Sequence, residues 1–114
     1  MPEPSPLTPD QIAKLARGLA SPARVAILNQ FSGGCSRTTG EIVAASGLAQ
    51  STVSEHLRFL RDAELLSARP DGPRVWYCLR RSVIRLFMRA LADWASEPES
   101  APLVTLPGDE GPYR

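Results

Sequence analysis

The chain has 114 residues, a length that suits one domain with a single hydrophobic core. Its contents of 43% hydrophobic and 22% charged residues are ordinary for a globular protein, and no run approaches the roughly 20 apolar residues of a membrane span. The first ten residues, MPEPSPLTPD, lack the basic and apolar regions of a secretory signal, so we expect a cytoplasmic protein.

Charge is divided unevenly along the chain. The net charge is only +1. Residues 96–114 hold four acidic side chains against one arginine, which leaves residues 1–95 with 12 basic and 8 acidic side chains and a net charge of +4. A mildly basic body with an acidic end is compatible with a basic face that the whole-chain average conceals.

Three helices are predicted in the first half of the chain. The first begins at residues 8–11, TPDQ, which combine a capping hydroxyl, a proline at the first helical position and a glutamine that closes a capping box. The second begins at residues 21–22, SP, and ends at residues 32–34, SGG; a short third helix begins near residue 38 or 39. Residues 46–49, SGLA, then form a tight turn whose glycine accepts a left-handed conformation.

The segment QSTVSEHLRFL, residues 50–60, opens a fourth helix that we expect over residues 50–63. Val53, Leu57 and Leu60 are spaced four and three residues apart and form one apolar stripe. The first turn carries short polar side chains, where a solvated helix more often carries long ones. Short donors and acceptors suit a helix whose N-terminal end lies close to a polar partner.

The period of the pattern changes after the fourth helix. Residues 65–69 and 75–80 read as two strands around the tip PDGP, and a final helix follows over residues 81–95. We expect residues 1–7 to be flexible and residues 96–114 to be a Pro-rich, disordered acidic tail. The predicted fold is mainly α with a small β-hairpin: a winged helix-turn-helix of five helices and a two-stranded wing, in one DNA-binding and dimerisation domain over residues 8–95.

In a helix-turn-helix the second helix enters the major groove of double-stranded DNA, and its N-terminal residues meet base edges. Glutamine can bond adenine, serine or threonine can bond either type of base, a carboxylate can accept from cytosine, and arginines contact phosphates. Nine side chains are therefore candidates for DNA contact: Arg37, Gln50, Ser51, Thr52, Ser54, Glu55, His56, Arg58 and Arg74.

Each of these candidates also has a simpler interpretation. The polar residues of the first turn can cap the helix at a solvated surface, and Glu55 can pair with Arg58 or Arg61 along the helix. His56 can pack or cap instead of touching a phosphate. Arg37 and Arg74 can be solvated.

Three motifs carry a family resemblance: LASPARVAIL at residues 19–28, GLAQSTVSEHLRFLRDAELL at residues 47–66 and DGPRVWYCL at residues 71–79. Together they make residues 19–80 resemble the ArsR-type (ArsR/SmtB) transcription regulators. The resemblance implies a homodimeric repressor that binds a palindromic operator and is released by an inducer. It departs from the family pattern at Ala49, where a capping serine is common, and at Glu55, where arginine is common.

The resemblance also implies that the first and last helices form the dimer interface. The apolar face of residues 83–94 fits a partner surface independently, and the alternative is that it covers the core of its own chain. The predicted interface residues are Ile12, Leu15, Leu19, Ile84, Phe87, Leu91 and Trp94.

The signal that such a repressor would sense is open. The positions that hold metal ligands in related regulators carry here Thr38 and Gly40, or about Arg80, Ser82, Asp93 and Ser96, and the only histidine is His56. We therefore expect no metal and no cofactor. Three interpretations of Cys35 and Cys78 are open: they are two inert small side chains, they form a thiol switch, or they bind a soft metal.

Two other classes of protein compete with a DNA-binding regulator. A winged helix can be a protein interaction module, although the short polar side chains and the basic body argue against it, and strongly salt-dependent affinity for DNA would separate the two. An enzyme is disfavoured because one histidine and no nucleophile motif leave little from which to build a catalytic site.

Overall fold

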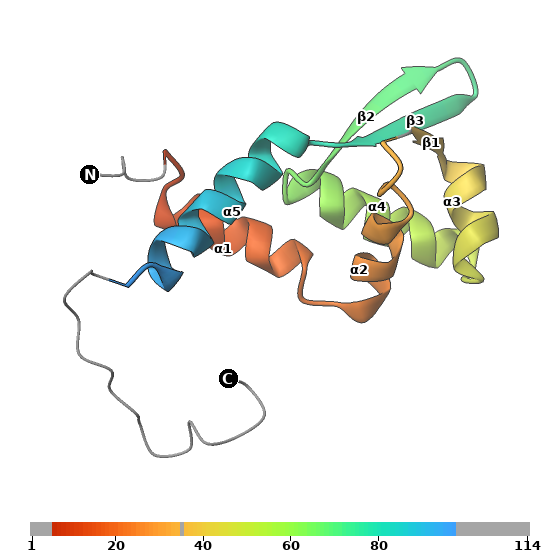
Figure 1. The fold of residues 1–114 in the computed structure, drawn as a ribbon. Helices are drawn as coiled ribbons and strands as arrows, with labels where there is room; N and C mark the ends of the chain where they lie inside the picture. Colours follow the sequence, from red (N-terminus) through yellow and green to blue (C-terminus); the bar gives the residue numbers. More distant parts are fainter. Residues whose placement is uncertain (1–5, 35, 98–114) are drawn as a thin grey trace.

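The computed structural model of the chain describes residues 6–34 and 36–97. In this part of the chain, five helices and a three-stranded sheet follow in the order α1 (Pro9–Gly18), α2 (Pro22–Asn29), β1 (Arg37–Thr38), α3 (Thr39–Ser46), α4 (Gln50–Asp62), β2 (Leu66–Asp71), β3 (Arg74–Leu79) and α5 (Arg81–Ala95). Figure 1 shows α1 and α5 side by side at one end of the molecule, with α3 and the hairpin tip at the opposite end. The predicted winged helix-turn-helix fold is confirmed.

The predicted terminal segments lie mostly outside the described residues, as does Cys35. Leu7, at the edge of the first segment, is half-buried and packs against the core. Among the helices that the structure describes, none combines the length and the apolarity that a membrane crossing requires.

The predicted helix starts follow from side-chain caps. The Thr8 hydroxyl accepts a hydrogen bond from the Gln11 N–H at 3.2 Å, and the Gln11 side chain accepts one from the Thr8 N–H at 2.8 Å. Thr38 and Glu41 form the same reciprocal box at the start of α3, with distances of 3.2 and 3.0 Å. Two orphan N–H groups are satisfied in each case, so both starts are set by residues three apart.

The sheet differs from the predicted two-stranded wing in two ways. A short strand, β1, pairs with β3 on the side away from β2, so the sheet has three strands in the order β1-β3-β2. The hairpin also extends to its tip, where Asp71 pairs with Arg74 across Gly72 and Pro73. Pro70 does not end β2 because that strand lies at an edge of the sheet, where a missing N–H is tolerated.

The core lies between the helices and the base of the hairpin. The predicted stripe of α4 is confirmed, since Val53, Leu57 and Leu60 have no exposed surface. They pack with buried apolar residues from α1, α2, α3, β2 and α5, including Leu15, Ile27, Phe31, Ile42, Leu66 and Phe87. Burial of about eight large side chains at roughly 1.5–3 kcal/mol each supplies the main driving force for the fold. This packing leaves the opposite face of α4 directed outward.

The turn between α3 and α4 also follows the sequence. Gly47 has a φ of 70°, the left-handed conformation that the turn requires and that glycine adopts without steric cost. The turn aligns the N-terminus of α4 with the tip of the wing.

Candidate nucleic-acid interface

The outer face of α4 carries the predicted base-contacting side chains. Gln50, Ser51, Thr52, Ser54 and Glu55 are all exposed. Ser51 and Glu55 lie four residues apart on the face opposite the buried stripe, and Arg58 continues that face one turn further. The helix therefore offers a row of short hydrogen-bonding groups that ends in a cation, all available to a partner outside the chain.

The first turn of α4 has no side-chain cap. Ala49 occupies the N-cap position and cannot supply a hydrogen-bond acceptor, whereas α1, α2 and α3 are all capped by a hydroxyl. Backbone N–H groups at an uncapped N-terminus, together with the positive end of the helix dipole, favour an anion such as a phosphate. The departure at Ala49 thus leaves donors available at the end of the helix that carries the polar row.

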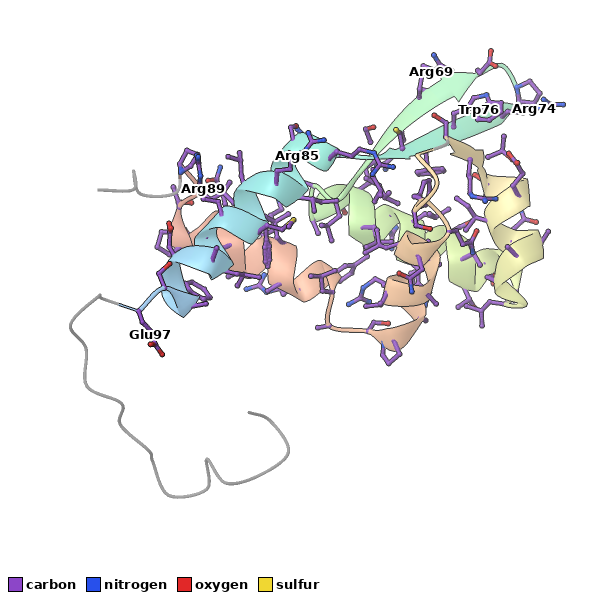
Figure 2. The ribbon with its side chains drawn as sticks, in the orientation of Figure 1. Arg69, Arg74, Trp76, Arg85, Arg89 and Glu97 are labelled. Atoms are coloured by element: carbon purple, nitrogen blue, oxygen red, sulfur yellow. The ribbon has the colours of Figure 1, made fainter. Side chains whose placement is uncertain are left out.

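A groove of about 630 Å³ separates this end of α4 from the wing. Its lining comes from the start of α3, from Gln50 and from the wing tip, and comprises Thr38, Thr39, Gly40, Glu41, Gln50, Pro73, Arg74, Val75 and Trp76. Figure 2 shows Arg74 at the wing tip and Trp76 further down β3, with Arg69 on the neighbouring strand. The wing and the predicted recognition helix therefore face a common space.

The arginines of this region are not equivalent. Arg74 is exposed and has no hydrogen bond or ion pair with any residue that the structure describes, so its charge is available to a phosphate. Arg37 is half-buried, and its Nε donates a hydrogen bond to the Gln30 carbonyl at 2.6 Å. That bond ties β1 to the end of α2, so the main role of Arg37 is structural. Only its remaining N–H groups are left to contact DNA.

Two carboxylates at the groove are held by neighbours. The Thr38 backbone N–H and hydroxyl donate hydrogen bonds to Glu41 and hold the pKa of Glu41 below its usual value of 4.5, with smaller contributions from the positive charges of Arg37 and Arg74. Asp71 accepts a hydrogen bond from the Trp76 indole N–H at 3.2 Å. Glu41 lines the groove itself, whereas Asp71 holds Trp76, which lines it.

The remaining predicted contact, His56, is half-buried on the flank of α4. It precedes Phe59 by three residues, so both lie on the side of α4 that faces α2 and not the wing. Thr39 and Trp76 line the groove but are not among the predicted DNA contacts. The signal that could have identified Trp76 is a tryptophan at the second position of the predicted wing strand, residues 75–80.

The predicted dimer residues divide into two groups. Leu15 and Phe87 are buried in the core of the single chain, with 1% and 8% exposure, so they are not available to a partner surface. Leu19, Leu91 and Trp94 are exposed, while Ile12 and Ile84 are half-buried. Met88, which the sequence interpretation omitted, is 63% exposed one turn before Leu91 and Ala92. Helical spacing places the residues of the core and the exposed residues on one stripe, so periodicity alone could not separate the two groups.

Cys78 lies half-buried on β3 and lines a cavity of about 220 Å³ with Ser36, Ser67, Arg69 and Trp76. Ser36 follows Cys35 directly in the sequence, so the chain next to Cys35 passes the same cavity. Within residues 6–34 and 36–97, no three His, Cys, Asp or Glu side chains converge where they could bind a metal ion.

Comparison with known proteins identifies the family. The profile described as "Bacterial regulatory protein, arsR family" matches residues 21–68. The regulator YgaV of Escherichia coli is 29% identical over 82 residues, which cover 72% of this chain and 83% of that protein. A probable mercury resistance operon repressor of Streptomyces lividans is 42% identical over 69 residues, 60% of this chain and 54% of that protein.

A solved structure supports the same assignment. The homodimeric winged helix-turn-helix DNA-binding domain Mb0332 of Mycobacterium bovis superposes with a TM-score of 0.62 at 31% identity, over 75% of this chain and 82% of that one. The helix-turn-helix of α3 and α4 and the wing agree with the winged helix-turn-helix of that domain. The chain therefore belongs to the ArsR family of bacterial regulators, which are DNA-binding winged helix-turn-helix transcription regulators and not enzymes.

Proposed function

We propose that this chain is a repressor that binds a palindromic operator as a homodimer and is released by an inducer. The observation that carries the proposal is the pairing of an uncapped, exposed N-terminal half of α4 with the free Arg74 across one groove. In this proposal Gln50, Ser51, Thr52 and Ser54 meet base edges. Arg58, Arg74 and the free N–H groups of Arg37 meet phosphates, with Glu55 and His56 at the flanks of the contact.

The proposed dimer surface is the apolar face shared by α1 and α5. It consists of Leu19, Met88, Leu91 and Trp94, which are exposed by 41, 63, 43 and 69%, together with the half-buried Ile12 and Ile84. Large apolar side chains grouped on one face of a soluble domain mark an interaction surface. A self-complementary two-fold interface would place two α4 helices on one face of the dimer, and such a dimer matches a palindromic DNA site. The solved Mb0332 domain is homodimeric, which supports the same arrangement here.

Binding to DNA can be tested by fluorescence anisotropy with a labelled duplex from the region upstream of the chain's own gene. We expect affinity to fall by at least tenfold between about 50 and 200 mM salt, because phosphate contacts release counterions. We also expect a shuffled duplex of the same composition to bind more weakly. Equal affinity for both duplexes, or none for either, would contradict specific DNA binding and favour the protein interaction module.

The inducer that we propose is an oxidant acting on Cys35 and Cys78. The cavity that Cys78 shares with Ser36 supports this, because it brings the chain next to Cys35 close to the second thiol. Oxidation by hydrogen peroxide would form one S–S bond and transfer the two thiol protons and two electrons to the peroxide, whose O–O bond breaks to give two water molecules. The new bond would join Cys35, two residues before β1, to β3 and alter the wing.

The same anisotropy assay tests the switch. Peroxide treatment should weaken binding to the upstream duplex, dithiothreitol should restore it, and Cys35→Ser and Cys78→Ser should each bind normally and ignore peroxide. Binding that survives peroxide in the wild type would make both cysteines inert and leave the repressor with another signal.

A further inference from the structure

One arginine joins three helices on the side of the molecule away from the wing. Arg24 lies in the first turn of α2 and is half-buried. Its Nε donates a hydrogen bond to the Gly18 carbonyl and its Nη2 donates one to the Arg17 carbonyl, both at 2.9 Å. These carbonyls belong to the last turn of α1, where the helix dipole is negative, and the Arg17 carbonyl also accepts a hydrogen bond from the Ala20 N–H at 3.1 Å. The planar guanidinium therefore closes the C-terminal end of α1 with two bonds in fixed directions.

The same guanidinium also contacts α4. Its Cζ lies 4.1 Å from the centroid of the Phe59 ring, within the distance of a cation–π interaction. Phe59 is 41% exposed and lies outside the buried stripe of α4, so its position is not explained by the core. In the described part of the chain no carboxylate pairs with Arg24, so the two carbonyls and the ring are its partners.

A second contact fixes the same junction. A Cβ atom added to Gly18 would collide with Leu65 Cδ1 and lie 3.1 Å from Ala63 Cβ, so the end of α1 packs directly against the end of α4. A side chain at position 18 would require Leu65 to move out of this contact. The junction is therefore held by the close packing of Leu65 and Ala63 on Gly18 and by the Arg24 guanidinium beside it.

We propose that Arg24 is a positioning residue that fixes the direction of the recognition helix relative to the dimer surface. The inference rests on the proposed function. In that function α1 belongs to the dimer surface and α4 reads DNA, so the angle between α1 and α4 sets the spacing of the two recognition helices. Arg24 and Phe59 hold that angle without touching DNA or the partner subunit. Their loss should weaken the simultaneous engagement of two half-sites while leaving each single α4 competent.

The first test compares two DNA probes. One is a duplex with two half-sites, selected from a random pool by the wild-type protein, and the other is the same duplex with one half-site shuffled. Arg24→Lys keeps the charge but loses the planar fork, and Phe59→Leu keeps an apolar group but loses the ring. For each variant we expect the ratio of full-site to half-site affinity to fall about tenfold, with half-site affinity within about twofold of the wild type, because bivalent binding depends on geometry.

Controls separate positioning from stability. Arg89→Lys removes a guanidinium from the exposed face of α5, which Figure 2 shows far from the junction, and should leave the ratio unchanged. The effect of the double variant Arg24→Lys with Phe59→Leu should be smaller than the sum of the two single effects, since the contact between Arg24 and the Phe59 ring is common to both. If Arg24 had only a structural role, Arg24→Lys would lower the melting temperature and reduce the full-site and half-site affinities by the same factor. An unchanged ratio in Arg24→Lys would overturn the inference.

A DNA-free measurement distinguishes failure of this inference from failure of the proposed function. Spin labels on Glu55→Cys, in a Cys35→Ser and Cys78→Ser background, report the distance between the two α4 helices of a dimer by pulsed electron paramagnetic resonance. We expect one narrow distance distribution that broadens in Arg24→Lys. An identical distribution in both proteins would refute the positioning role even if DNA binding holds. Absence of any intersubunit signal would refute the dimer and the inference together.

Discussion

The two ends of the molecule expose opposite kinds of side chain. At the α4–wing end the exposed groups include an amide, hydroxyls, arginine and the Glu55 carboxylate, while Val53, Leu57 and Leu60 of α4 are fully buried. At the α1–α5 end, Met88, Leu91 and Trp94 are exposed although they are large and apolar. The surface at the α4–wing end therefore suits a polar, anionic polymer, and the surface at the α1–α5 end suits a second apolar surface. In the proposed dimer, the α4–wing end would contact DNA and the α1–α5 end would join two such DNA-binding surfaces.

The largest effect should come from charging the apolar end. Leu91→Glu combined with Trp94→Glu should abolish the dimer, because burial of two unpaired carboxylates opposes association. The loss of bivalency should lower affinity for the full duplex by about a hundredfold or more. Sedimentation velocity and anisotropy measure the two effects. Ala92→Glu is the matched control, because Ala92 is exposed on α5 nearer the side that carries Arg89. If the variant with both Leu91→Glu and Trp94→Glu sedimented with the same mass as the wild type, the proposed interface would be contradicted.

Removal of one base-reading group at the polar end should have the next largest effect. Gln50→Ala should lower affinity for the preferred duplex by about tenfold, within the roughly 1–3 kcal/mol of a good base contact. The loss of affinity caused by Gln50→Ala should be much smaller on duplexes in which the base that Gln50 reads has been changed. Competition binding against single-base variants measures this. A uniform loss over all duplexes would mean that Gln50 does not read sequence.

Removal of a phosphate contact should have a smaller, sequence-independent effect. Arg74→Ala should weaken binding a few-fold on every duplex and reduce the slope of log affinity against log salt by about 1, as expected for one lost phosphate contact. Arg89→Ala, on the α5 face in Figure 2, should leave the slope unchanged. A normal slope in Arg74→Ala would place the wing tip away from the phosphates.

The smallest effect concerns the capping box that borders the groove. The pKa of Glu41 is lower in the folded chain than its ordinary value, so its ionised form stabilises the fold at pH values above 4.5. That contribution is lost as the pH falls through the lower folded pKa. Glu41→Gln should therefore melt at a slightly lower temperature than the wild type at about pH 7, and the gap should close as the pH falls through the folded pKa of Glu41. A gap that is constant with pH would mean that the charge of Glu41 contributes nothing.

Elements defined by local signals could be predicted from the sequence. The boxes at Thr8 and Thr38, the glycine turn and the apolar stripe of α4 each depend on residues within seven positions of one another. Short-range hydrogen bonds and helical spacing decide these features before any tertiary contact forms. The same locality explains why the polar side chains of α4 lie on its exposed face, while their contact with DNA stays a prediction.

Features that depend on distant pairing could not be predicted. The two residues of β1 become a strand only because β3, about 40 residues later, offers them an unpaired edge. The roles of Arg24 and Arg37 depend on carbonyls and a ring brought close by folding. Periodicity also could not decide whether Leu15 and Phe87 face the chain's own core or a partner, since both surfaces require the same spacing.

The most direct test of the account is a hydroxyl-radical footprint of the full chain on its selected duplex. If two α4 helices and two wings bind as proposed, two protected segments should appear, related by two-fold symmetry with centres about one helical turn, or 10 base pairs, apart or a multiple of it. Leu91→Glu with Trp94→Glu should reduce them to one weak segment. A single protected segment with the wild-type protein, or protection without sequence preference, would contradict a dimeric operator-binding repressor.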